Sequence, residues 1–303
     1  MPDQYDESSI KNCYSTWSQN YYNDYYGSKE AYPPVHRDLL KYLLREAKVN
    51  SILDAGCGPA SFLRELGDEN LDLYGFDLTP EMVLEGQMVL EKHGIPSSHL
   101  WTGNVLDPTS FHMPGKKRVK RFDAVICIGV LPHIPHGHDI TVIKNLRNAV
   151  KPKGLVVVEA RNQFFSFFTL NRYSYNFFME ELIRREHLLD KAGTGKTQLI
   201  SLMKSLENQF HMDLPPIRKG KESEPGYDEI LSRTHNPLLL KEQFISQGFK
   251  DVKLLFYHYH CLPPMFEKEI PELFRQESLA MEDPEDWRGY FMASAFLLLG
   301  KPA

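Results

Sequence analysis

The sequence has few cysteines, and none of them belongs to a CxxC pair. The four stand far apart along the 303 residues, at Cys13, Cys57, Cys127 and Cys261. Zinc knuckles and disulfide frameworks need closely spaced cysteines, so this spacing predicts neither. Reduced thiols are typical of the cytoplasm, which is the location that we expect.

Long apolar runs and an excess of positive charge are also missing. No apolar run approaches the ~20 residues of a membrane-spanning helix, and residues 1–12 are polar and acidic, unlike a secretory signal. The net charge is −5 and the pI is about 6.2, whereas nucleic-acid-binding domains are usually basic. We therefore expect neither a membrane nor a nucleic acid as a partner.

What the sequence does contain is an alternation of short apolar runs with helix-like stretches. The runs that are predicted to be strands are 51–56, 71–78, 99–105, 122–129, 154–161, 251–261 and 290–300. Strands that alternate with helices form parallel sheets covered on both faces, and right-handed crossovers make such a sheet doubly wound. The predicted fold is α/β, with a doubly wound, seven-stranded, mostly parallel, Rossmann-like sheet.

This alternation is interrupted, which divides the chain into three parts. Residues 49–161 and 237–303 are predicted to form the Rossmann-like core. Residues 162–236 are predicted to be a helical substrate-binding insertion over the C-terminal edge of the sheet. Residues 1–48, which are rich in tyrosine, are predicted to be a helical lid.

A glycine-containing turn, DAGCGP at 54–59, follows the first predicted strand. Gly56 and Gly58 let the backbone turn tightly and approach a ligand, and the next helix begins with unpaired N–H groups. Ser61 stands where a dinucleotide enzyme has its third glycine, which disfavours a nucleotide-dependent oxidoreductase. A simple strand-to-helix turn is the alternative.

A second acid, Asp77, ends the next predicted strand. A carboxylate at this position can accept hydrogen bonds from two ribose hydroxyls. The alternative is that Asp77 caps the helix that starts near Pro80, a role for which Thr79 competes.

Five stretches in order resemble the motifs of class I S-adenosylmethionine (SAM)-dependent methyltransferases of the small-molecule type. They are LDAGCGPASF (53–62), LYGFDLTPEMV (73–83), TGNVLD (102–107), FDAVICIGVLPHI (122–134) and NAVKPKGLVVVE (148–159). The resemblance implies SAM as the cofactor and methyl transfer as the activity.

By this resemblance, the turn at 55–58 lies against the methionine part of SAM, Asp54 orients that turn or meets the amino group, and Asp77 holds the ribose. Asn104 and Val105 frame the adenine, although many relatives have Asp in place of Asn104. The implied cofactor-binding residues are Tyr14, Trp17, Tyr21, Asp54, Ala55, Gly56, Gly58, Asp77, Leu78, Asn104, Val105 and Ile128. The aromatic N-terminal residues resemble a lid whose rings attract the sulfonium cation, although some of them could only pack a helix on the sheet.

Three histidines are candidates for a general base. His133 follows the fourth predicted strand at the carboxyl edge, where ligands bind in open α/β sheets, although Pro132 stands where many relatives have an orienting Glu. His235 is the second candidate and His260, two residues after His258, is the third. A structural role is the alternative for each, and without a third ligand the HxH pair does not predict a metal site.

The aromatic run at 164–178 is predicted to line the acceptor pocket, with about half of its rings only anchoring the insertion. The candidate substrate-binding residues are Tyr25, Arg161, Phe165, Phe168, Arg172 and Tyr175. Basic residues in the insertion (Arg172, Arg218, Lys219, Lys221) leave room for a phosphorylated or nucleotide-linked substrate. The basic run at 116–121 precedes a strand and is predicted to be a solvated loop.

We therefore expect a methyltransferase that acts on a hydroxyl of a small molecule by in-line displacement, with a histidine as base. An N-methyltransferase of a small amine and a non-catalytic SAM-binding protein remain as alternatives. The sequence leaves a homodimer open.

Overall fold

The computed structural model describes residues 6–26, 34–115, 120–214 and 229–303. Its centre is a seven-stranded sheet in the order β3-β2-β1-β4-β5-β7-β6. The strands are β1 (Ser51–Ala55), β2 (Asp72–Asp77), β3 (Leu100–Thr102), β4 (Phe122–Cys127), β5 (Val150–Arg161), β6 (Phe249–Tyr259) and β7 (Ala293–Pro302). Only β7 runs antiparallel to its neighbours, which confirms the predicted mostly parallel sheet.

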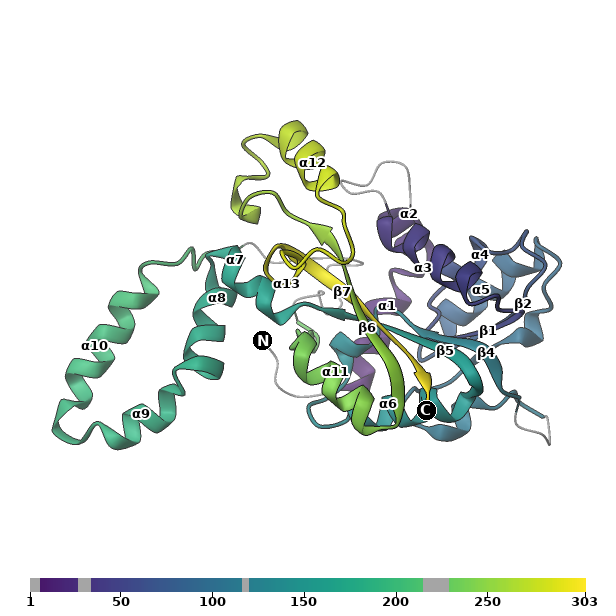
Figure 1. Cartoon of the computed structure of the whole chain (residues 1–303), viewed down its shortest axis with the longest axis horizontal. Coiled ribbons are helices and arrows are strands. Elements are labelled where there is room, and N and C mark those ends of the chain that lie inside the picture. The colour runs from purple at the N-terminus through teal and green to yellow at the C-terminus, as the bar shows by residue number, and fades with distance from the viewer. Residues whose placement is uncertain (1–5, 27–33, 116–119, 215–228) are drawn as a thin grey trace.

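Helices cover both faces of this sheet (Figure 1). On one face pack α3 (Val35–Glu46), α4 (Ser61–Arg64) and α5 (Pro80–Glu91). On the other pack α6 (Asp139–Ala149) and α11 (Pro237–Ser246). Because side chains alternate along a strand, Ile52 faces the first layer and Leu53 the second. Two apolar layers around one sheet confirm the doubly wound architecture.

The sequence placed the strands well but their ends less well. The strand predicted at 154–161 begins earlier, at Val150, and the strand predicted at 290–300 begins later, at Ala293. The residues before it form the short helix α13 (Gly289–Met292), because Met292 N–H bonds back to the carbonyl of Arg288. Apolar content alone does not separate a buried helical turn from a strand.

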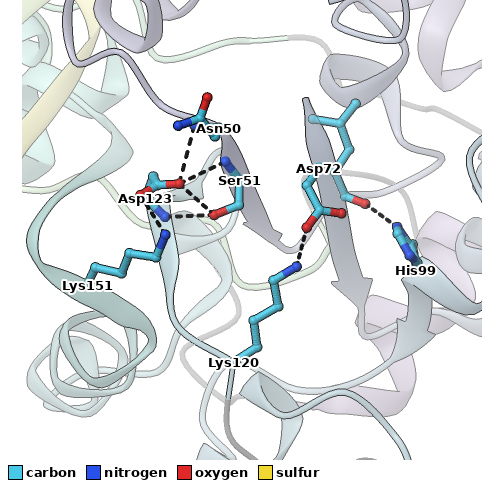
Figure 2. A network of polar contacts seen from close by, with 8 residues as sticks. Asn50, Ser51, Asp72, His99, Lys120, Asp123 and Lys151 are labelled. Carbon is cyan, nitrogen blue, oxygen red and sulfur yellow. Dashed lines mark hydrogen bonds and ion pairs between the residues drawn. The ribbon is translucent and has the colours of Figure 1, made fainter. Parts of the chain in front are cut away.

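The amino edge of the sheet is held by polar contacts (Figure 2). The Asp123 carboxylate accepts hydrogen bonds from the Ser51 N–H at 3.1 Å and hydroxyl at 2.9 Å, and from Lys151 at 2.8 Å. Lys120 pairs with Asp72 and lies 3.9 Å from the centre of the Tyr74 ring. Lys120 of the basic run therefore has a structural role, while 116–119 lie outside the described residues.

Residues between β5 and α11 form the helices of the insertion, which are α7 (Ser166–Thr169), α8 (Arg172–Phe177), α9 (Arg185–Lys191) and α10 (Lys196–Glu207), with a π-helical turn at Phe178–Leu182. Helices α9 and α10 stand away from the sheet (Figure 1). They share a small apolar core with α8 around Met179 and Met203. A bridge between Asn162 and His235 joins the two ends of the insertion at the sheet.

The remaining helices lie near the ends of the chain and are α1 (Glu7–Ser15), α2 (Ser18–Tyr26) and α12 (Pro271–Ala280). None of the helices in the described part of the chain combines the length and apolarity needed to span a membrane.

Candidate functional site

A pocket of about 680 Å³, which is open to solvent at its mouth, lies where the carboxyl ends of β1, β2, β3 and β4 meet α1 and α2. Ligands in open α/β sheets bind at this edge. The pocket is lined by Ile10, Tyr14, Tyr21, Gly56, Gly58, Asp77, Leu78, Thr79, Met82, Gly103, Asn104, Val105, Ile128, Gly129, Val130, His133 and Ile134. The pocket thus brings together nine of the predicted cofactor-binding residues and the first predicted base, His133.

The turn after β1 forms the floor of the pocket. The N–H groups of Gly56 and Cys57 both donate to the carbonyl of Phe76, at 2.8 and 3.0 Å, which fastens the turn to β2. Gly58 has φ +52°, and a Cβ on it would point into open space, whereas a Cβ on Gly56 would lie 2.1 Å from the Val130 side chain. Gly58 therefore leaves room for a ligand, and Gly56 leaves room for Val130.

Two acids lie beside this turn. Asp77 accepts hydrogen bonds from the N–H groups of Gly58 at 2.8 Å and Thr79 at 2.9 Å, so it orders the turn after β1. The N-cap residue of α5 is Thr79, and no side chain makes a capping hydrogen bond to that helix. Asp54 is only 3% exposed, and among the described residues its Oδ1 has no hydrogen-bond partner. Burial and, to a lesser extent, the charge of Asp77 raise the pKa of Asp54 to about 8. A buried acid of this kind suits a cationic ligand group.

Part of the pocket wall is apolar, and α1 contributes to it. Ile10 and Met82 line it with Val105, whose carbonyl accepts from Asn145 at 2.9 Å. Asn104 accepts from the Leu106 N–H at 2.9 Å through Oδ1, and its Nδ2 donates to a carboxylate oxygen of α1 at 3.1 Å. The Asn104 amide thus orders its own loop and attaches α1 to it.

The predicted N-terminal aromatic residues divide into two layers. Tyr14 and Tyr21 line the pocket. Trp17, which is 2% exposed, stacks on Tyr14 at 5.8 Å between ring centres and donates its indole N–H to Asp24. Tyr25 packs on Tyr21 at 4.8 Å and does not line the pocket. Trp17 and Tyr25 therefore support the two tyrosines that face the pocket.

His133 is held through both ring nitrogens. Its Nδ1 lies 2.7 Å from the carbonyl oxygen of Leu231, and its Nε2 lies 2.7 Å from the hydroxyl of Tyr14. Burial, with a smaller contribution from the positive charge of Arg161, lowers the pKa of His133 to about 4. The imidazole is therefore neutral at pH 7.

The other two candidate bases lie outside the pocket lining. His235 is 4% exposed, and its Nε2 is 3.4 Å from Asp139 Oδ1. The centre of the His260 ring lies 4.8 Å from that of Phe165 and 5.3 Å from that of His258. Burial lowers the pKa of His258 to about 4. Neither His235 nor His260 lines the pocket, and a role of either residue as the base stays a prediction.

The predicted substrate-binding residues are spread over a wider area. Arg161 at the end of β5 donates a hydrogen bond to the hydroxyl of Ser232. The ring centres of Phe165 and Phe168 lie 6.3 Å apart. The other two lie on α8. The Arg172 guanidinium is 5.3 Å from the ring of Tyr173, and Tyr175 belongs to the apolar core between α8 and α10. None of these residues lines the pocket.

Several of the predicted aromatic residues instead anchor the insertion. The ring of Phe167 packs against those of Phe177 and Phe178, with 4.9 and 5.5 Å between ring centres. The ring of Phe164 stacks on that of Phe291, which lies just before β7. Arg218, Lys219 and Lys221 lie outside the described residues. Among the described residues no group of three or more His, Cys, Asp or Glu side chains could hold a metal ion.

The pocket is also lined by residues that are not among the predicted site residues. Met82, Val130 and Ile134 belong to the methyltransferase-like stretches 73–83 and 122–134, and their position after a strand is a signal for them. Ile10 had no such signal, because only the packing of α1 onto Leu78 and Ile230 brings it to the pocket.

A model of the methyltransferase domain family matches residues 28–211, more than half of the chain. A sequence search of curated proteins gave no match. The chain is similar to magnesium protoporphyrin IX methyltransferase from Synechocystis PCC 6803 with bound SAH, with 12% identity, TM-score 0.53, and coverage of 98% of this chain and 100% of that one. It is also similar to a SAM-dependent methyltransferase from Clostridium acetobutylicum ATCC 824, with 11% identity, TM-score 0.53, and coverage of 96% and 100%. At such identities the two structures support the fold.

Proposed function

The chain belongs to the class I SAM-dependent methyltransferases, and we propose that it methylates a hydroxyl group of a small molecule. SAM, when bound, supplies an electrophilic methyl group on a sulfonium. Asp77 in the pocket wall suits its ribose hydroxyls, the buried Asp54 beside the turn suits a cationic group, and the open side of Gly58 leaves space for its chain. The residues of the pocket therefore fit this cofactor.

The observation that carries the hydroxyl proposal is the neutral imidazole of His133 in the pocket wall, bonded to Tyr14. Removing a proton from a hydroxyl as it attacks typically accelerates such a reaction 10²–10⁴-fold. An amine attacks in its neutral form and needs less help. A buried, neutral histidine next to a pocket hydroxyl therefore favours an oxygen acceptor.

The helices that lie over the pocket support a small acceptor. Helices α1 and α2 contribute Ile10, Tyr14 and Tyr21 to the pocket wall. Hydrogen bonds from Tyr22 to Glu65 at 2.6 Å and from Asn104 to Glu7 at 3.1 Å tie these helices to the core. Helices placed over part of a site limit the access of water to it and help to hold the reacting atoms in line.

The test is an incubation of the whole chain with SAM carrying an isotopically labelled methyl group and a panel of hydroxyl and amine metabolites. We expect a labelled methyl ether, and slower formation of it by the Asp77→Ala variant when SAM is below saturation. Labelled amines alone would contradict the hydroxyl proposal. Calorimetric binding of SAM without any product would make the chain a non-catalytic SAM-binding protein.

A further inference from the structure

Tyr14 and His133 form a short chain of hydrogen bonds that starts in the pocket. The Tyr14 hydroxyl lies 2.7 Å from His133 Nε2, and His133 Nδ1 lies 2.7 Å from the carbonyl oxygen of Leu231. The rings of Tyr14 and His133 meet edge-on at 80° with their centres 5.4 Å apart. Both residues line the pocket, and His133 is only 7% exposed.

The direction of each hydrogen bond follows from the groups involved. A carbonyl oxygen only accepts, so the proton between His133 and Leu231 belongs to Nδ1. A neutral imidazole then has a lone pair on Nε2, and the hydroxyl of Tyr14 must donate to it. The Tyr14 hydroxyl therefore donates its hydrogen bond to His133. The lone pairs of the Tyr14 oxygen can then accept a hydrogen bond from a molecule in the pocket.

We propose that Tyr14 is a catalytic residue that takes the proton of the acceptor hydroxyl and passes its own proton to His133. The inference rests on the proposed function. The acceptor O–H bond breaks as an O–H bond to Tyr14 forms, and the original Tyr14 proton moves to Nε2. The electron pair left on the acceptor oxygen forms the new bond to the methyl carbon. The positive charge that was on the sulfonium ends on the His133 imidazolium.

The surroundings of Tyr14 and His133 keep both residues neutral before the reaction. Burial raises the pKa of Tyr14 well above its ordinary value, although Arg161 opposes this. Burial and Arg161 keep His133 neutral, while the Leu231 carbonyl favours its charged form. Neither a phenolate nor an imidazolium is therefore stable before the reaction. Both protons must move together with the methyl group.

The backbone around His133 is held in place by a second segment. The Arg233 N–H donates to the carbonyl of Pro132 at 2.8 Å, and the Arg233 side chain donates to the carbonyl of Ile134 at 2.6 Å. The same segment supplies the Leu231 carbonyl. This fixes the imidazole in the tautomer that the relay requires.

The first test needs no acceptor and uses ¹⁵N NMR of the histidine rings of the whole chain with SAH, with His133→Gln assigning the signals. We expect a proton on Nδ1 and none on Nε2, and a titration midpoint well below the ordinary histidine value. Tyr14→Phe should raise that midpoint, because the neutral form loses an accepted hydrogen bond, whereas the exposed Tyr42→Phe control should not. A proton on Nε2, or an unchanged midpoint in Tyr14→Phe, would overturn the proposal.

The second test measures turnover with the hydroxyl acceptor found in the labelling panel. Tyr14→Phe should lower kcat by about 10²–10⁴-fold with little change in the Kd for SAH, and Tyr14→Phe/His133→Ala should be no worse than either single variant. If Tyr14→Phe keeps the kcat of the unmodified chain, the relay fails while the proposed function stands. If the unmodified chain methylates only amines, the proposed function fails and the relay falls with it.

Discussion

Arg233 binds Asp139 through both terminal nitrogens of its guanidinium, at 3.1 and 2.9 Å, across 94 residues of sequence. Their side chains are 10% and 9% exposed. Arg233 also bonds to the carbonyls on either side of His133. This buried ion pair therefore fastens the segment that returns from the insertion onto the loop that carries His133.

Replacing Arg233 by alanine should lower the free energy of unfolding by about 3–5 kcal/mol, because the Asp139 carboxylate would be left buried without its partner. Chemical denaturation measures this change. Arg45→Ala removes the surface pair with Glu69, where the arginine side chain is 66% exposed, and should cost no more than about 1 kcal/mol. Equal losses in the two variants would mean that the Arg233 pair does not hold the fold.

Asp77→Ala should weaken SAM binding by roughly 1–3 kcal/mol, because the ribose hydroxyls would lose their acceptor. Isothermal calorimetry with SAM measures the change. Asp68, whose side chain is 97% exposed, provides the matched control as Asp68→Ala, which should bind SAM normally. Unchanged affinity in folded Asp77→Ala would remove Asp77 from the cofactor site.

Gly58→Ala should weaken SAM binding by about tenfold or more, equivalent to ~1.4 kcal/mol, because the new methyl group would point into the pocket. Gly94→Ala is the control, since both glycines have positive φ (+52° and +73°) and open space around a Cβ. Both variants should lose similar stability from backbone strain, and only Gly58→Ala should lose affinity. A Gly56 variant would be less informative, because its side chain would collide with Val130.

Binding of SAM near pH 7 should release up to about one proton. Burial and the charge of Asp77 raise the pKa of Asp54 to about 8, so without ligand it stays protonated, and a cation would favour its ionised form. Because the folded pKa is raised, stability without ligand should fall as the pH rises from about 4 to about 8. Calorimetry in buffers of different ionisation enthalpy counts the proton, and Asp54→Asn should remove most of the release. The same proton count in Asp54→Asn would exclude Asp54 as its source.

His133→Ala should lower kcat by about 10²–10⁴-fold and leave the affinity for SAM nearly unchanged, because the relay would lose its final acceptor. His235→Ala and His260→Ala should have milder effects, since neither residue lines the pocket. Steady-state kinetics of the three variants decides among them. A larger loss in His235→Ala than in His133→Ala would move the base to the insertion.

The parts of the site that sequence alone could predict are those in which neighbouring residues act together. Gly58, Asp77 and Asn104 each lie at or just after the end of a strand within a short motif, and the strand order then brings them into one pocket. The contact between Tyr14 and His133 joins residues 119 positions apart, and the Leu231 carbonyl is 98 positions from the histidine that it orients. No local pattern encodes such pairs.

The packing of the insertion likewise depends on residues that are far apart in the sequence. Its aromatic run was compatible with a pocket wall or with an anchor, because both need large apolar side chains. Only the packing of Phe164 and Phe167 on Phe291, which comes from the far end of the chain, decides for the anchor. His235 likewise has a suitable position in the sequence, but its ring lies next to Asp139.

The most direct measurement supplies SAM with an isotopically labelled methyl group, together with a metabolite extract, to the unmodified chain and to His133→Ala in parallel. Mass spectrometry then follows the label. We expect a labelled methyl ether from the unmodified chain and at least about a hundredfold slower formation of it by His133→Ala, with SAM bound equally by both. An ether formed equally fast by both proteins, or label found only on nitrogen, would contradict it.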